Sequence, residues 1–98
     1  MQFSWNDDKR QKNIEKHGID FVDAAQIFDG FRISRIDNRF DYGETREISI
    51  GMMNDIMVIV VVHTDRDGTQ HLISARPASR KERKIYHDAK ALRETDYE

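Results

Sequence analysis

The chain has 98 residues, no cysteine and a formal net charge of −2 at pH 7, and we expect a chain of this length to form a single domain over residues 1–98. The absence of cysteine excludes disulfides and thiolate metal sites and favours a cytoplasmic protein. No apolar run suits an export signal or a membrane span, so we expect neither, and no contact with a membrane.

The N-terminal segment predicts a short helix behind two aromatic side chains. Phe3 and Trp5 alternate with polar residues, which fits either a short strand or two anchors that hold the N-terminus to the core. Asn6 is a favourable N-cap residue, and Gly18 provides the left-handed conformation that commonly ends a helix. We therefore expect the first helix over residues 7–17.

One face of this predicted helix carries Lys9, Asn13 and His17, because these residues are spaced four apart. Such a face fits either the wall of a site or a solvated surface. A second helix is predicted after Asp20, where the apolar spacing within residues 21–28 indicates packing against a core.

The middle of the chain predicts four strands separated by turn residues. The expected strands are residues 31–36, 46–53, 56–62 and 70–75. Residues 54–55 and 65–68 suit tight hairpin turns, so the last three strands should form an antiparallel meander that the first strand joins. We expect an α+β fold: two N-terminal helices, a four-stranded or possible five-stranded antiparallel sheet covered by helices on one face, and a C-terminal helix.

The C-terminal helix is predicted from a capping motif after Pro77, a residue that cannot donate to a strand ladder. Ser79 and Glu82 form the S-x-x-E capping box, which starts the helix at Arg80. The residues expected to face the core are Ile85, Ala89 and Leu92. Residues 94–98 are expected to form a frayed tail.

Positive charge is concentrated where the last strand meets this helix. Residues 76–93 contain seven Lys or Arg residues and two acidic residues, although the whole chain is slightly acidic. This run fits either contacts with phosphate or acidic groups, or a solvated helix face.

These residues suit the cleavage of RNA by its own 2′-OH group. That reaction requires a base, cations beside the phosphate and a proton donor for the leaving oxygen. Arg76 stands at a rigid strand end and Arg46 begins a neighbouring strand, and arginine binds phosphate with two parallel hydrogen bonds. Glu44 and His17 are the candidate base and acid.

Structural interpretations remain open beside the catalytic ones. Arg76 equally suits an ion pair with Glu44 or Glu82, and Tyr86 suits either catalysis or packing at the edge of the core. The four histidines lack metal-ligand spacing, and no nucleotide-binding motif is present, so we expect no metal and no cofactor. Two of these histidines, His63 and His71, are expected at the surface of the hairpin strands.

Three blocks in the same order and register resemble the BrnT toxins of bacterial type II toxin–antitoxin systems. The blocks are FSWNDDK with NIEKHGIDF in residues 3–21, GETREISIG in residues 43–51, and ISARPASRKERKIY in residues 73–86. The resemblance implies a fold like that of the RelE toxins and a metal-independent endoribonuclease that inhibits translation. It also implies a BrnA-like ribbon-helix-helix antitoxin as partner, with operator DNA bound only through the complex.

Two sets of functional residues are expected, the catalytic set from the resemblance and the RNA-binding set from the basic side chains of the predicted helices. The catalytic set would be His17, Glu44, Arg46, Arg76, Arg83 and Tyr86. The RNA-binding set would be Lys9, Lys12, Arg80 and Lys84. The alternative function is a binding module without catalysis, which would dock a DNA-binding partner in a repressor complex.

Overall fold

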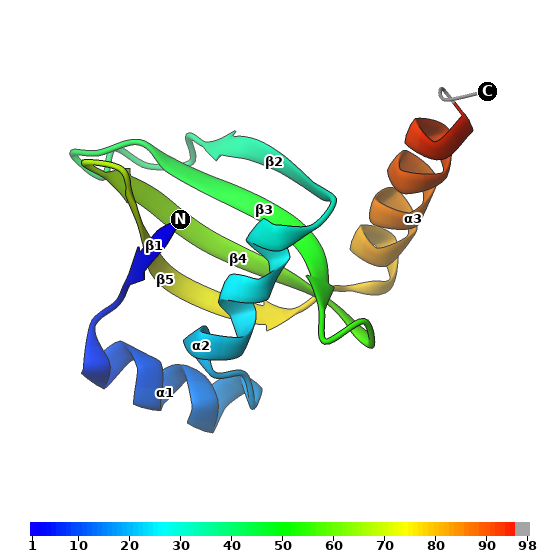
Figure 1. The fold of residues 1–98 in the computed structure, drawn as a ribbon. Coiled ribbons are helices and arrows are strands. Elements are labelled where there is room, and N and C mark those ends of the chain that lie inside the picture. Colours follow the sequence, from blue (N-terminus) through cyan, green and yellow to red (C-terminus); the bar gives the residue numbers. More distant parts are fainter. Residues whose placement is uncertain (96–98) are drawn as a thin grey trace.

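The computed structural model describes residues 1–95 as a five-stranded sheet with helical segments on both of its faces (Figure 1). The strands are β1 (Gln2–Ser4), β2 (Arg32–Asp37), β3 (Arg46–Met53), β4 (Met57–Arg66) and β5 (Thr69–Pro77). The helical segments are α1 (Asp7–His17), α2 (Phe21–Ala24), the 3₁₀ helix η1 (Ala25–Asp29) and α3 (Arg80–Thr95).

The sheet has the order β1-β5-β4-β3-β2 and is mixed. The predicted antiparallel meander is confirmed, because β2, β3, β4 and β5 pair consecutively and antiparallel. The expectation of a purely antiparallel sheet is wrong, since β1 adds a parallel strand at the edge of β5. Phe3 pairs there with Gln70, a contact between the two ends of the chain that local sequence patterns do not encode.

The local signals at helix ends and turns are confirmed. The Asn6 side chain accepts a hydrogen bond from the Lys9 amide at 3.1 Å, and Gly18 ends α1 with φ of 72°. The β3–β4 turn places both Asn54 and Asp55 at positive φ, as tight hairpins require.

One face of the sheet packs against α2 and η1. Phe21 and Ile27 are almost fully buried there against Ile59 and Leu72 of the central strands. Gly51 on β3 permits the close approach of η1, because a Cβ at this position would lie 2.6 Å from the Ile27 Cβ. The predicted packing role of residues 21–28 is confirmed.

The other face packs against the start of α3, so the expectation that helices cover a single face is wrong. Tyr86 is buried against the side of the sheet that carries Ile48 and Val60. The predicted core row of α3 is also wrong, because Ile85 is 45% exposed and Leu92 is 67% exposed. Leu92 is exposed because α3 leaves the sheet after its first turns (Figure 1). Ile85 lies within those first turns but lines an open hollow beside Ile48 and Ile50.

The predicted frayed tail begins inside a helix. Glu94 and Thr95 belong to α3, and the remaining residues of that predicted tail, 96–98, lie outside the described part of the chain. No helix within residues 1–95 is long and apolar enough to cross a membrane.

His63 is buried with 1% exposure, which corrects the expectation that it lies at the surface. Its Nε2 atom lies 2.7 Å from Ser49 Oγ, and its Nδ1 atom lies 2.8 Å from Gln70 Oε1. The His63 ring also makes an edge-to-face contact with the Phe28 ring, so the imidazole is fixed by both of its nitrogens and by this ring contact. Burial holds the pKa of His63 below its ordinary value of 6.5, although the Gln70 hydrogen bond opposes this shift.

The free energy of unfolding is therefore expected to fall as the pH falls below about 6.5. The unfolded chain takes up a proton at the ordinary histidine pKa, whereas folded His63 takes it up only at lower pH, so protons favour the unfolded chain. Urea unfolding at pH 7.5 and 5.5 measures this loss. His63→Asn should show a smaller loss over the same interval, and an identical loss in both proteins would contradict the assignment.

Candidate functional site

The face of the sheet opposite α2 presents charged side chains beside apolar ones, and we call it the open face. Arg46 lies on it because it alternates in step with Ile48 and Ile50 along β3. Arg76 lies on the same face because it pairs directly with Val60 of β4, whose side chain packs toward α3.

At one end of the open face, Arg46 is held by the loop that joins β2 to β3. Its guanidinium lies 4.0 Å from the centre of the Tyr42 ring, and the Tyr42 hydroxyl donates to Asp37 at 3.1 Å. Arg39 donates to both oxygens of Asp37 at 2.8 and 2.9 Å, which holds the pKa of that carboxyl far below its ordinary value. These contacts fix the loop, and among residues 1–95 the buried Nε of Arg46 has no hydrogen-bond partner.

Glu44 lies beside Arg46 and forms an ion pair with Arg66 of β4. The two guanidinium nitrogens of Arg66 lie 3.1 and 3.3 Å from the Glu44 oxygens. These hydrogen bonds are the main cause of a lowered Glu44 pKa, and the charges of Arg66, Arg46 and His71 add to the effect against a smaller opposing cost of burial. Glu44 is therefore an ionised carboxylate at neutral pH.

His71 on β5 completes this cluster and was not among the residues selected from the sequence. Its Nδ1 atom lies 2.9 Å from Ser4 Oγ on β1, so the parallel edge strand orients the ring. Burial is the largest cause of a pKa below 6.5, and the charges of Arg66 and Lys9 lower the pKa further while Glu44 opposes them. The ring is half-buried rather than a simple surface group, and it is neutral at pH 7.

At the other end of the open face, Arg76 is held by Glu82. Two nitrogens of Arg76 donate to the two Glu82 oxygens at 2.8 Å each, and Glu82 also accepts the Ser79 amide at 2.8 Å. These hydrogen bonds, with that from Arg76 as the largest cause, lower the pKa of Glu82 to about 2. The capping box is confirmed, and Glu82 rather than Glu44 is the structural partner of Arg76.

The register of the sheet separates Arg76 from Arg46. Arg76 is level with Ile50, which is four residues along β3 from Arg46 and two strands away. Ordinary strand geometry then gives roughly 16 Å between their Cα atoms. The charge of Arg39 acts to lower the pKa of Arg76, so a third cation lies within electrostatic reach of Arg76. Arg46 and Arg76 therefore do not converge on one point, and they lie at the two ends of a positively charged strip along the open face, which we call the RNA track.

The centre of the predicted α1 face does not form the wall of a site. Asn13 is 7% exposed and hydrogen bonds to the backbone of Ile19 and Ala75, so it fastens α1 to β5. His17 is half-buried in the last turn of α1, and within the described chain no hydrogen bond or ion pair joins it to Glu44 or Arg46. The face is therefore mainly a packing surface.

The predicted α3 residues lie apart from the Glu44 cluster. Tyr86 is 1% exposed with its ring 5.6 Å from that of Phe31, which favours the packing role that the sequence left open. Arg83 donates to the Ala78 carbonyl at 3.0 Å and lines a second hollow with Met52.

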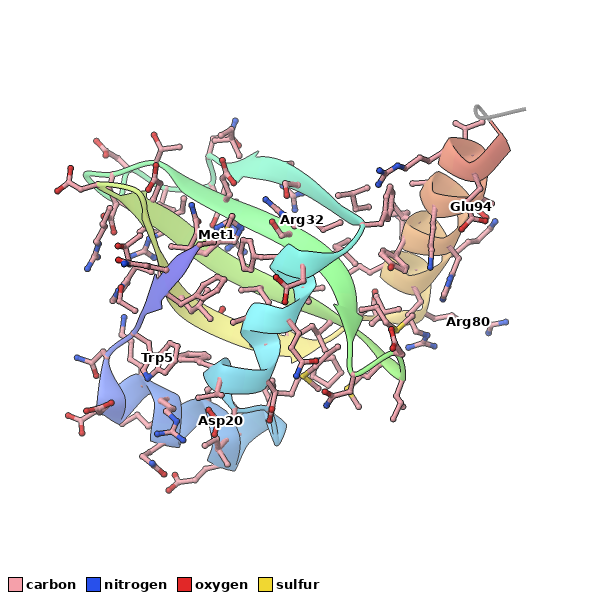
Figure 2. The ribbon with its side chains drawn as sticks, viewed as in Figure 1. Met1, Trp5, Asp20, Arg32, Arg80 and Glu94 are labelled. Atoms are coloured by element: carbon pink, nitrogen blue, oxygen red, sulfur yellow. The ribbon has the colours of Figure 1, made fainter. Side chains whose placement is uncertain are left out.

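The remaining predicted RNA contacts are exposed lysines and an arginine. Arg80 lies at the start of α3 (Figure 2), and Lys84 pairs with Asp88 at 2.7 Å. Lys9 and Lys12 lie on α1, and only Lys9 influences the pKa of a cluster residue. Among residues 1–95, no three His, Asp or Glu side chains are grouped so as to hold a metal ion, so no residue is assigned to one.

Comparisons with known proteins concern the sequence and the fold as a whole. Residues 5–82 match the family described as "Ribonuclease toxin, BrnT, of type II toxin-antitoxin system". The fold is similar to the crystal structure of the Brucella abortus ribonuclease toxin BrnT, with a TM-score of 0.62 and 29% sequence identity. The match covers 82% of this chain and 99% of that one. No curated protein sequence matches the chain significantly.

Proposed function

The chain belongs to the BrnT family of ribonuclease toxins of type II toxin–antitoxin systems, and from this we propose that it is an endoribonuclease that cleaves RNA on the open face of its sheet. The observation that carries the proposal is the cluster of Glu44, Arg46, Arg66 and His71, in which a neutral imidazole lies among cations. RNA supplies the phosphate charge that these cations bind.

The proposed reaction is attack by the 2′-OH group on the adjacent phosphorus. His71 accepts the 2′-OH proton, because its pKa lies below 6.5 and the ring is neutral at pH 7. The O2′–P bond forms, the bond from phosphorus to the 5′ oxygen breaks, and that oxygen takes a proton from solvent, which leaves a cyclic phosphate. Arg46, in the same cluster as His71, stabilises the charge on the oxygens of this phosphate, and this route uses no metal. Arg76 lies at the far end of the track and binds another phosphate of the same RNA.

Glu44 has a different role in this proposal. Its carboxylate is held by two hydrogen bonds from Arg66 and has a lowered pKa, which makes it a weak base. We assign it to orienting Arg66 and to partly offsetting the positive charge around His71. His17, Arg83 and Tyr86 remain sequence predictions without a contact to this cluster.

The cellular role follows from the family. As a type II toxin, the chain would be neutralised by a protein antitoxin, which we propose to be BrnA-like with a ribbon-helix-helix region that binds operator DNA. Cleavage of cytoplasmic RNA would inhibit translation. A purified chain incubated with total RNA in EDTA tests the enzymatic proposal directly, because RNA that remains intact would contradict it.

The rate of RNA cleavage is expected to rise with pH along a limb centred below pH 6.5, since His71 must be neutral to accept a proton. His71→Gln should lower the rate about 10²-fold or more and remove that limb. Pre-steady-state cleavage of a labelled RNA between pH 4.5 and 8 measures both effects. His87→Gln is the control on α3, and equal profiles for the two variants would contradict the role of His71.

A second candidate is a non-catalytic module that docks a DNA-binding partner in a repressor complex. The favouring observation is that Arg76 is already bound to Glu82 and that Tyr86 is buried, so two predicted catalytic groups have structural partners. Binding of operator DNA by the complex without RNA cleavage by the free chain would select this function.

A further inference from the structure

A groove of about 570 Å³ runs between the open face and the first turns of α3. Its floor is aliphatic and consists of Ile33, Ile48, Ile50 and Ile85. Ile85 is 45% exposed, which is unusual for a large aliphatic side chain that neighbours other isoleucines. The groove adjoins the RNA track because Arg76 belongs to both.

The chemistry of the floor is unsuited to nucleotides. Bases in single-stranded RNA bind by stacking on aromatic rings, and this groove has no aromatic residue in its lining. The exposed aromatic side chain Phe40 instead belongs to the β2–β3 loop beside Arg46, with its ring 5.9 Å from that of Tyr42. An aliphatic floor suits the leucine, isoleucine, valine or methionine side chains of a polypeptide.

The rim of the groove is cationic. Arg35 and Lys81 are exposed on it, and within residues 1–95 neither has an ion-pair partner. The acidic residue of the lining, Glu82, already accepts hydrogen bonds from Arg76 and from the Ser79 amide. A polypeptide with carboxylates flanking aliphatic residues is therefore complementary in charge to the groove.

We propose that this groove is the docking site for an acidic, amphipathic segment of the antitoxin, which places aliphatic side chains on the isoleucine floor and carboxylates beside Arg35 and Lys81. The proposal rests on the proposed function, since it names the surface on which the toxin is neutralised. A segment seated there covers Arg76 and closes one end of the RNA track.

Ile85→Asp tests the groove, because it places a charge on the floor while the exposed position on α3 tolerates a polar residue. The affinity for the purified antitoxin of the same operon, measured by isothermal titration, should fall at least 100-fold. Leu92→Asp is the matched control, since Leu92 is an exposed aliphatic residue of α3 outside the groove, and it should bind like the parent chain. Lys81→Glu should weaken binding about 10-fold, more so at low salt.

Parallel measurements separate the possible outcomes. Thermal melts of the variants exclude a fold defect, and RNA cleavage by the antitoxin-free variants should be retained. Equal antitoxin affinity for Ile85→Asp and the parent chain would overturn the proposal, as would loss of a dimer of the toxin alone on sedimentation of Ile85→Asp. A failure of the proposed function is distinct, because the parent chain would then not cleave RNA even though the affinity series could still be measured.

Discussion

Arg76→Ala is expected to reduce RNA cleavage at low RNA concentration by about 10-fold, the loss typical of removing one hydrogen bond to a charged group. Arg76 lies near the end of β5, and Glu82 holds its two terminal guanidinium nitrogens, so the side chain is already oriented before it binds an RNA phosphate at this end of the track. Single-turnover cleavage of a labelled RNA over a range of protein concentrations separates this loss of binding from an effect on the chemical step.

The stability of the Arg76→Ala protein should change little. The Arg76–Glu82 pair has side chains 44% and 24% exposed, and exposed ion pairs contribute less than about 1 kcal/mol. Glu82 keeps its hydrogen bond from the Ser79 amide, so the start of α3 remains capped.

A matched control is Arg10→Ala. Arg10 makes a similar two-bond pair with Asp20, and the two side chains are 33% and 26% exposed, but it links α1 to the start of α2 away from the open face. The control should retain cleavage. Similar losses of cleavage in both variants, or a loss in Arg76→Ala that follows its unfolding, would show that Arg76 is structural.

Asn13→Ala is expected to lower the free energy of unfolding by about 3 kcal/mol or more. The Asn13 amide donates to the carbonyls of Ile19 and Ala75 at 2.8 and 2.9 Å and accepts the Ala75 amide at 3.1 Å. Alanine leaves these backbone groups unpaired at the edge of β5 that faces away from β4, where β1 does not reach. Chemical denaturation measures the loss, which is large against the total stability of about 5–15 kcal/mol for a domain.

The adjacent Lys12→Ala is the stability control, because Lys12 is exposed and should change the free energy of unfolding by less than about 0.5 kcal/mol. Folded Asn13→Ala protein should cleave RNA at a rate within about twofold of the parent. If the Asn13→Ala protein has unchanged stability but no longer cleaves RNA, the structural role of Asn13 is contradicted and Asn13 belongs to the wall of the site.

Much of the fold was predictable because its signals are local. Asn6, Gly18 and the Ser79–Glu82 capping box act within one helical turn, and the two hairpin turns fix the order of three strands. The packing of α3 was not predictable from periodicity alone. Periodicity marks Ile85 and Leu92 as apolar positions, but whether they face a core depends on how far the sheet extends beneath the helix.

The site was predictable only in part for the same reason. Arg46 and Arg76 come from motifs that place them near strand ends, and the structure puts both on one face of the sheet, with Glu44 in the loop just before β3. His71 and Arg66 were missed because their roles depend on contacts across strands, and one of those contacts joins residues 67 positions apart. The one sequence signal for His71 was its position in the alternating pattern of the last strand. Residue spacing could not show that β1 pairs in parallel with this strand and orients the ring.

The parallel pairing of β1 with β5 also determines when the toxin becomes complete during its synthesis. β1 and α1 are made first, yet the backbone groups that they bind belong to β5, which is among the last elements made. Ser4 consequently has no histidine to orient, and Asn13 has no strand to bind, until β5 has been synthesised. The cluster around His71 and the anchor of α1 are therefore assembled only after β5 has been made.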